Sequence, residues 1–441
     1  MITVSLVIRA YPWPKNLKLE MNKWLRVIGI GEDGWDDLAA DTRALLYESK
    51  TVLGGERHLK MIPDDWEGER IVWPSPIREA VSKIVSWRPD SSEKNRNQET
   101  SLPVVIMASG DPLCYGIAAK LLKHLPIEEI WIKPALSTFS LICSRVGWSL
   151  PDVETLTIHG RPVEVLHPFV QPGAKLLVLS KGEESPKQAA ELLTNRGFGN
   201  STITVLEHLG GGKERQFNGQ AGSWTHPEGA TLNAMAIECI PGKNADVLAR
   251  IPGLPDEAFF HDGQLTKREI RAVTLSKLMP IVGHLLWDVG AGCGSVAIEW
   301  MRFHPSCRAI SIEKSKSRLK LIEQNACDLG VPMLEIISGT APESLKNLPD
   351  PDAIFIGGGL ASPELPASGN LMDTCWKALN PGGRLVANSV TLESEQQLLK
   401  WQKINGGDLS RLNLSHAESI GKFQGWESLR PVTQLSVIKN Y

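Results

Sequence analysis

The 441-residue chain lacks long apolar runs, an excess of charge of one sign, and cysteine pairs at metal-binding spacing. No stretch approaches the ~20 apolar residues of a membrane helix, which excludes an integral membrane protein with helical spans. The net charge is −3, and residues 250–441 contain as many basic as acidic side chains. Neither half has the basic excess with which nucleic-acid-binding proteins displace counterions. Any anionic ligand must therefore be met by local positive charges.

The seven cysteines are scattered and form no CxxC pair. This pattern argues against a disulfide framework or a zinc knuckle and predicts a protein of the reducing cytoplasm. The histidines show no HExxH or other paired spacing, so we expect no metal site and interpret them as structural. Residues 1–23 are too short in apolar sequence for a signal peptide, and we interpret them as a loosely ordered leader in which Met21 is an alternative start.

Short apolar segments alternate with turns and helical patterns along most of the chain. Leu25–Gly31, Pro103–Ala108 and Ile130–Lys133 each read as a strand that enters a turn rich in glycine or proline. Such alternation predicts an α/β fold with parallel sheets. Residues 241–256 are rich in proline and glycine, so we place a linker there, between domains at 24–240 and 257–441. Neither half repeats the other, which predicts two different folds.

The clearest motif of the C-terminal half is Asp288-Val289-Gly290-Ala291-Gly292-Cys293-Gly294, between a predicted strand and a predicted helix. Glycines let the backbone turn sharply and approach a ligand beside a helix N-terminus. A dinucleotide site requires G-x-G-x-x-G, and Ser295 occupies the place of its last glycine. The observed spacing resembles the first motif of Rossmann-like methyltransferases that use S-adenosylmethionine. A nucleotide-dependent oxidoreductase and a tight turn without ligand remain alternatives.

The ends of the next two predicted strands add candidate contacts. Glu313 could accept hydrogen bonds from ribose hydroxyls, and Gly339-Thr340-Ala341-Pro342 could form a wall for adenine. A further predicted strand, Ala353–Ile356, is followed by Gly357-Gly358-Gly359 and not by an Asn-Pro-Pro-Tyr element. That absence argues against methylation of nucleobase amines.

Four segments of this half occur in a family-specific order: Gln264–Arg271, Trp287–Gly292, Pro351–Gly359 and Pro381–Asn388. Together they resemble the decarboxylating precorrin-6Y C15-methyltransferases of cobalamin biosynthesis, from residue 256 to about 400. Cys293 stands where that family commonly has serine. The resemblance implies that Thr266 closes over the cofactor beside the glycine loop. The predicted cofactor-binding residues of this half are Thr266, Gly290, Ala291, Gly292, Cys293, Gly294, Glu313, Thr340 and Ala341.

The N-terminal half resembles the tetrapyrrole methylase family over residues 24–240, and within it the precorrin-6Y C5-methyltransferases. The resemblance rests on Gly29-Ile30-Gly31, Ser109–Gly116, Pro134–Thr138, Ile158–Pro162 and Glu207–Gly210, in that order. This family folds as two α/β subdomains with S-adenosylmethionine between them. The resemblance implies a cofactor site formed by Gly31, Ser109, Gly110, Asp111, Ser137 and Thr138. For Asp111 the alternative is a turn that its own side chain fixes.

Together the two resemblances imply a fused bifunctional methyltransferase acting on precorrin-6Y, a polycarboxylate tetrapyrrole. It would methylate C5 and C15 and remove the carboxyl of the ring C acetate, giving precorrin-8X. We assign no catalytic side chain, because the macrocycle supplies the carbon nucleophile. We expect a cytoplasmic homo-oligomer that binds no nucleic acid and no membrane. An oxidoreductase and a non-catalytic tetrapyrrole carrier remain open, as do the order of methylation and the metal state of the macrocycle.

Specific cations must meet the substrate carboxylates, because the C-terminal half has no net charge. Lys267 and Arg271 are spaced i, i+4 at the start of a predicted helix, Thr266–Leu278, and would share one helix face. Arg384 could add a bidentate contact. We therefore predict that Lys267, Arg271 and Arg384 bind substrate; the alternative is that they form surface ion pairs only.

Overall fold

The computed structural model describes residues 23–74, 76–89, 103–360 and 371–441. The predicted leader, except Lys23, lies outside the described residues. The described chain divides into two compact units. The first contains the residues up to His159, Lys175–Ala190 and Ser201–Glu238. The second contains Gly160–Ala174, Glu191–Asn200 and Cys239–Tyr441.

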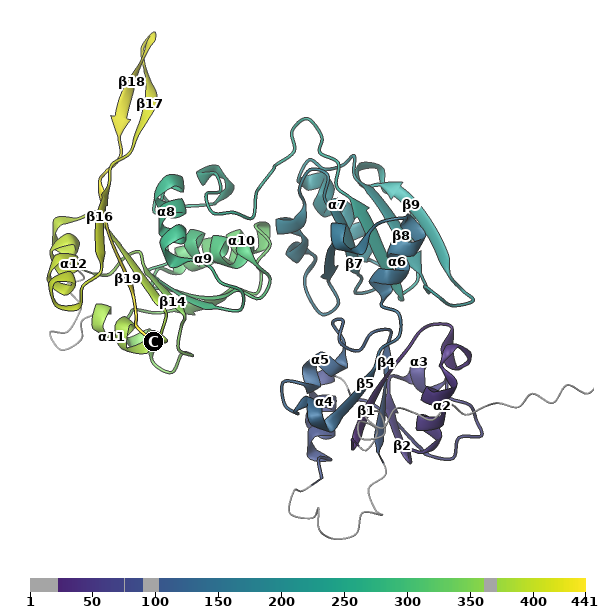
Figure 1. The fold of residues 1–441 in the computed structure, drawn as a ribbon. Helices are drawn as coiled ribbons and strands as arrows, with labels where there is room; N and C mark the ends of the chain where they lie inside the picture. The colour runs from purple at the N-terminus through teal and green to yellow at the C-terminus, as the bar shows by residue number, and fades with distance from the viewer. Residues whose placement is uncertain (1–22, 75, 90–102, 361–370) are drawn as a thin grey trace, which may run out of the picture. The chain divides into compact units, whose positions relative to one another are not determined.

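The first sheet contains five parallel strands in the order β3-β2-β4-β1-β5 (Figure 1). Their bounds are β1 Leu25–Ile30, β2 Thr51–Gly54, β3 Glu69–Val72, β4 Val104–Ser109 and β5 Ile130–Lys133. The connecting helices are α2 Ala40–Tyr47, α3 Glu56–Leu59, α4 Ile77–Ser86 and α5 Ile117–Leu121. Because β1 lies between β4 and β5, the carboxyl ends of these three strands meet at one edge.

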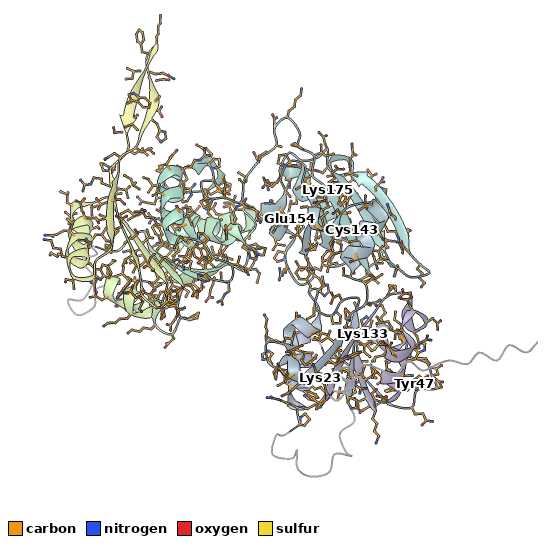
Figure 2. All side chains as sticks on the ribbon, in the orientation of Figure 1. Lys23, Tyr47, Lys133, Cys143, Glu154 and Lys175 are labelled. Atoms are coloured by element: carbon orange, nitrogen blue, oxygen red, sulfur yellow. The ribbon has the colours of Figure 1, made fainter. Side chains whose placement is uncertain are left out.

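The second sheet is mixed, in the order β6-β7-β10-β8-β9. β10 Asn233–Glu238 pairs antiparallel with both neighbours, whereas β6 and β7 pair in parallel. The other strands are β6 Glu154–Thr157, β7 Lys175–Leu179, β8 Thr202–Glu207 and β9 Arg215–Gln220, with helices α6 Thr138–Val146 and α7 Ser185–Asn195. Figure 2 labels Cys143 of α6, which packs in the same apolar cluster as Leu177 and Ala236 of the sheet. All seven cysteines are free.

The third sheet has seven strands in the order β13-β12-β11-β14-β15-β19-β16. The first five are parallel to one another, and β19 runs antiparallel to both of its neighbours, β15 and β16. Their bounds are β11 Leu285–Val289, β12 Arg308–Glu313, β13 Glu335–Ser338, β14 Ala353–Ile356, β15 Arg384–Ser389, β16 Asp408–Leu412 and β19 Val432–Ile438. A separate hairpin, β17 Ser415–Ile420 and β18 Phe423–Ser428, extends from the end of β16 (Figure 1).

Helices cover both faces of the third sheet because its central strands are apolar on both sides. Leu286 packs with α8 Arg268–Leu278, α9 Ser295–Phe303 and α10 Lys316–Asp328. Its neighbours Leu285 and Trp287 pack with α11 Leu371–Ala378 and α12 Leu392–Asn405 on the other face. This alternation follows from the two-residue period of a strand.

The predicted α/β class is confirmed, with different folds in the two halves. Within the described residues, no helix is long and apolar enough to span a membrane. Leu254, inside the predicted linker 241–256, is buried in the core of the third sheet's layer. Its backbone N–H and that of Gly253 donate to the Glu299 carboxylate at 3.0 and 2.6 Å. The last residues of the predicted linker thus pack as part of the C-terminal core.

Candidate functional site

The glycine loop between β11 and α9 requires glycine at three positions. Gly290, Gly292 and Gly294 have φ values of 73°, 61° and 83°, which L side chains rarely adopt. A Cβ on Gly290 would lie 3.0 Å from the Gly358 nitrogen, and one on Gly292 would lie 3.2 Å from the Gln264 carbonyl oxygen. The loop therefore lies against two other backbone segments, the end of β14 and the segment before α8.

Glu313, at the end of β12, holds this loop in place. Its Oε2 accepts a hydrogen bond from the Gly292 N–H at 2.9 Å, and its Oε1 accepts one from the Ser315 N–H at 2.9 Å. The residue is only 5% exposed. Each carboxylate oxygen has a further lone pair, so Glu313 can also accept hydrogen bonds from a ligand.

A second carboxylate lies beneath the loop. Asp288 is buried, and its Oδ2 accepts a hydrogen bond from the Ala297 N–H of α9 at 3.2 Å. Burial raises the pKa of Asp288 to about 7, and the nearby Glu313 adds to that rise. Its Oδ1 is buried and has no hydrogen-bond partner among the described residues.

A cavity of about 870 Å3 opens over the carboxyl ends of the parallel strands. This volume lies in the range of small-molecule sites, and the carboxyl end is where open α/β sheets bind ligands. Eight of the predicted residues line it: Thr266, Lys267, Gly290, Ala291, Gly292, Glu313, Thr340 and Ala341. The cavity continues past Asn388 to the base of the β17–β18 hairpin, where Leu412, Leu414, Leu429 and Arg430 line it.

Two predicted residues of the glycine motif point elsewhere. The Cys293 side chain is 1% exposed and packs in the apolar core with α9. Gly294 is the N-cap of α9, and a Cβ there would meet Ile322 of α10 at 3.0 Å. Neither lines the cavity, so a direct cofactor contact is not supported for these two residues. They shape the turn instead.

The structure does not place Arg271 or Arg384, predicted to bind substrate, among the residues that line the cavity. Arg271 has no exposed surface; its Nε donates to Glu299 at 2.6 Å, its Nη1 donates to Asp256 at 3.1 Å, and it also bonds the Leu254 and Thr266 carbonyls. Arg384 is 2% exposed and donates to the last carbonyls of α8, at 2.8 Å from Leu278 and 2.7 Å from Met279. Both guanidinium groups are thus bound by groups of the protein itself.

The prediction that Lys267 and Arg271 share one helix face depended on the first residue of α8. The helix begins at Arg268, and Lys267 is its N-cap with non-helical ψ of 149°. The i, i+4 rule therefore does not apply to Lys267 and Arg271. Lys267 lines the cavity and lies 3.4 Å from the Asp256 carboxylate.

The structure also brings together the loops predicted to form the N-terminal site. Gly110 donates to the Ile30 carbonyl at 2.9 Å, and the Gly110 carbonyl accepts from Ala135 at 3.2 Å. A Cβ on Gly110 would lie 3.0 Å from the Leu136 carbonyl oxygen. The three loops therefore meet at the edge of β4, β1 and β5. They carry the predicted residues Gly31, Ser109, Gly110, Asp111, Ser137 and Thr138.

Several side chains of this edge already have partners. Asp111 Oδ1 accepts from the Leu113 N–H at 2.9 Å, as in the turn alternative, and Ser137 caps α6 by accepting from Ser140 at 3.1 Å. Ser109 Oγ lies 2.9 Å from Arg57 Nη2 and 2.9 Å from His58 Nε2. Burial, with the Arg57 charge, lowers the pKa of His58 to about 4, so this imidazole is neutral near pH 7.

Sequence reasoning missed two polar residues of the C-terminal cavity. Asn388 ends a predicted strand, and that position was the available signal. Its Nδ2 donates to Thr274 at 3.0 Å, and its Oδ1 accepts from Gln434 at 2.9 Å. Arg430 had no such signal, because it reaches the cavity only when the hairpin returns to the sheet. Among the described residues, no group of three or more His, Cys, Asp or Glu could hold a metal ion.

Family comparisons agree with two kinds of methylase in one chain. Residues 25–224 match the family described as Tetrapyrrole (Corrin/Porphyrin) Methylases, and residues 257–439 match the Precorrin methyltransferase domain. The fold and the family matches thus define a methyltransferase that joins these two types.

Full-length relatives identify the family more narrowly. The Precorrin-6Y C(5,15)-methyltransferase [decarboxylating] of Sinorhizobium sp is 42% identical over 95% of this chain and 97% of its own length. The protein of that name from Mycobacterium tuberculosis is 36% identical over 94% and 99%. The solved C-terminal domain of the Rhodobacter capsulatus precorrin-6Y C5,15-methyltransferase is 44% identical, covering 44% of this chain and 100% of that one, with a TM-score of 0.40. The chain belongs to the family of decarboxylating precorrin-6Y C(5,15)-methyltransferases.

Proposed function

We propose that this chain transfers methyl groups from S-adenosylmethionine to C5 and C15 of precorrin-6Y and removes the ring C acetate carboxyl, giving precorrin-8X. Its membership of the family supports this proposal. The observation that carries it is the C-terminal cavity, which joins a glycine loop to an apolar wall in one space of about 870 Å3. One end suits a nucleoside cofactor, and the other suits a flat macrocycle.

The glycine-loop end fits S-adenosylmethionine. Gly290 and Gly292 leave no side chain between the backbone and a ligand, and Glu313 offers acceptor lone pairs for ribose hydroxyls. Thr340 and Ala341 form the adjoining wall, where the adenine would lie. When bound, S-adenosylmethionine supplies an electrophilic methyl group.

The C-terminal half also has to align the macrocycle carbon with the methyl group of S-adenosylmethionine. The macrocycle carbon is the nucleophile, so no side chain of the cavity needs to act as a strong base. Holding two reactants in contact can lower a barrier by up to ~7–11 kcal/mol in favourable cases. When the acetate C–C bond breaks, its electron pair passes into the protonated imine system of the macrocycle and CO2 leaves.

We place the other transfer at the edge of β4, β1 and β5. Gly31, Gly110, Ser137 and Thr138 would bring backbone close to a ligand there, and α6 begins at this edge after its Ser137 N-cap. Asp111 shapes the turn through its bond to Leu113. We also propose a cytoplasmic location, in which the seven free cysteines stay reduced. The expected homo-oligomer stays a prediction.

Calorimetric titration of the full chain tests the cofactor assignment. We expect two S-adenosylmethionine sites per chain and no binding of NAD. Binding of NAD without S-adenosylmethionine would favour the oxidoreductase alternative. A chain that binds the tetrapyrrole but neither cofactor would be a carrier, and the proposal would be wrong.

A further inference from the structure

The hairpin β17–β18 joins the sheet through a short neck, formed by Leu412, Leu414, Leu429 and Arg430. Leu412 ends β16, and Leu429 and Arg430 lie between β18 and β19. The Leu429 N–H donates to the Leu414 carbonyl at 2.9 Å, which holds the two strands of the neck together. All four side chains line the cavity that contains the glycine loop. The neck is therefore part of the site although the hairpin itself extends beyond it (Figure 1).

Apolar side chains dominate this end of the cavity. The three neck leucines are each half-buried, and Val390, which lines the same cavity, is 56% exposed. Open apolar side chains that face a cavity are typical of ligand sites, because a ligand can cover them. The neck thus presents an apolar surface in the same cavity as the methyl donor site.

Arg430 is the charged residue of the neck. Two other cations that line the cavity are paired with carboxylates. Lys267 lies 3.4 Å from Asp256, and Arg318 donates to Asp262 at 2.8 Å. In the described part of the chain, Arg430 has neither an ion pair nor a hydrogen bond from its side chain. An exposed guanidinium without a carboxylate partner can form a bidentate pair with a carboxylate of a ligand.

We propose that the hairpin neck is the macrocycle subsite of the C-terminal half. Leu412, Leu414 and Leu429 cover one face of the ring, and Arg430 pairs with one of its peripheral carboxylates. This inference rests on the proposed function, because it takes a polycarboxylate tetrapyrrole as the ligand. It replaces Arg271 and Arg384, which the structure buries, with a cation that a substrate can reach.

The test is steady-state release of CO2 from precorrin-6Y by the full chain with saturating S-adenosylmethionine. Arg430→Gln should raise KM for precorrin-6Y about tenfold, equivalent to about 1.4 kcal/mol, with a smaller change in kcat. Arg430→Lys keeps the positive charge but loses the two parallel N–H donors of the guanidinium, so KM for precorrin-6Y should rise less than in Arg430→Gln. Lys422→Gln, which removes the same charge at the tip of the hairpin, is the matched control and should match wild type.

The apolar half of the subsite has its own variant. Leu414→Ser should also raise KM, and its effect should persist at high salt, whereas the effect of Arg430→Gln should shrink as salt screens the exposed charge. Melting temperature and S-adenosylmethionine affinity should stay at wild-type values in the Arg430 variants. A wild-type KM in both Arg430→Gln and Leu414→Ser would overturn this inference. If wild type itself released no CO2, the proposed function would fail instead.

Discussion

Glu313→Gln is the sharpest test of the glycine-loop site. The carboxylate accepts one backbone N–H from the glycine loop and one from the start of α10, each at 2.9 Å. Glutamine has the same shape but a single acceptor oxygen, so one of these N–H groups would face an amide N–H. A hydrogen bond to a charged group contributes roughly 1.5–3 kcal/mol. We therefore expect a loss of about 2 kcal/mol in the free energy of unfolding and a weaker hydrogen bond to the Gly292 N–H.

The cofactor should be affected as well. A neutral amide with one oxygen already engaged is a poorer acceptor for ribose hydroxyls than a carboxylate. Calorimetric titration of the full chain should show one S-adenosylmethionine site weakened by ~10- to 100-fold, as expected for 1.5–3 kcal/mol, while the other is unchanged. Glu335→Gln, an exposed carboxylate at the start of β13, is the matched control and should leave both sites unchanged.

The two readouts separate structure from binding. A lower melting temperature with both S-adenosylmethionine affinities intact would refute the ribose assignment and leave Glu313 as a loop support only. Unchanged stability and unchanged affinity would refute the whole reading of the site.

Three further variants test other parts of the account. Arg271→Met should lower stability by about 3–5 kcal/mol, because the buried Glu299 loses its charged partner and keeps only the backbone donors Gly253 and Leu254. KM for precorrin-6Y should stay near wild type, and a raised KM at an unchanged melting temperature would support Arg271 as a substrate contact. Because burial raises the pKa of Asp288 to about 7, the native state binds this proton more tightly than the unfolded chain, so the Asp288 contribution to stability should fall as pH rises from about 4 to about 7 and should add a negative slope to stability against pH. Asp288→Asn should flatten that slope in denaturation curves, and an unchanged slope would count against the shifted pKa. Gly292→Val should abolish one S-adenosylmethionine site, since φ of 61° and the Gln264 carbonyl exclude its side chain; two intact sites would show that the loop is misassigned.

The buried strands were the most predictable part of the fold. The predicted strand Ile130–Lys133 equals β5, and the predicted strands Leu25–Gly31 and Pro103–Ala108 differ from β1 and β4 by one residue at their ends. All three are short apolar segments that end at turn residues. In each case the local sequence alone determines the element.

The antiparallel end of the third sheet was not predicted. Every residue of β17 is exposed, as is nearly every residue of β18, so neither strand shows an alternation of apolar and polar residues. Since Arg430 reaches the cavity through this hairpin, its place in the site could not be read from the sequence. Local pattern cannot reveal a contact that only tertiary folding creates.

Most of the predicted cofactor residues of the C-terminal half line the cavity, whereas two of the three predicted substrate residues do not, and the difference has a physical reason. Gly290 and Gly292 lie just after β11 and Glu313 ends β12, and the sheet brings strand ends together whatever the exact bounds of the helices. Lys267 and Arg271 depended on the exact first residue of α8, which helix patterns define poorly. The sequence also gave no sign that Arg271 would be buried and paired with Glu299, which is distant in sequence.

The most direct test of the central claim is mass spectrometry of the product that the full chain forms from precorrin-6Y and S-adenosylmethionine. The account predicts a product with two added methyl groups and one CO2 lost, since each half performs its own transfer. A product with one added methyl and an intact acetate, or an unmodified macrocycle that stays bound, would contradict it.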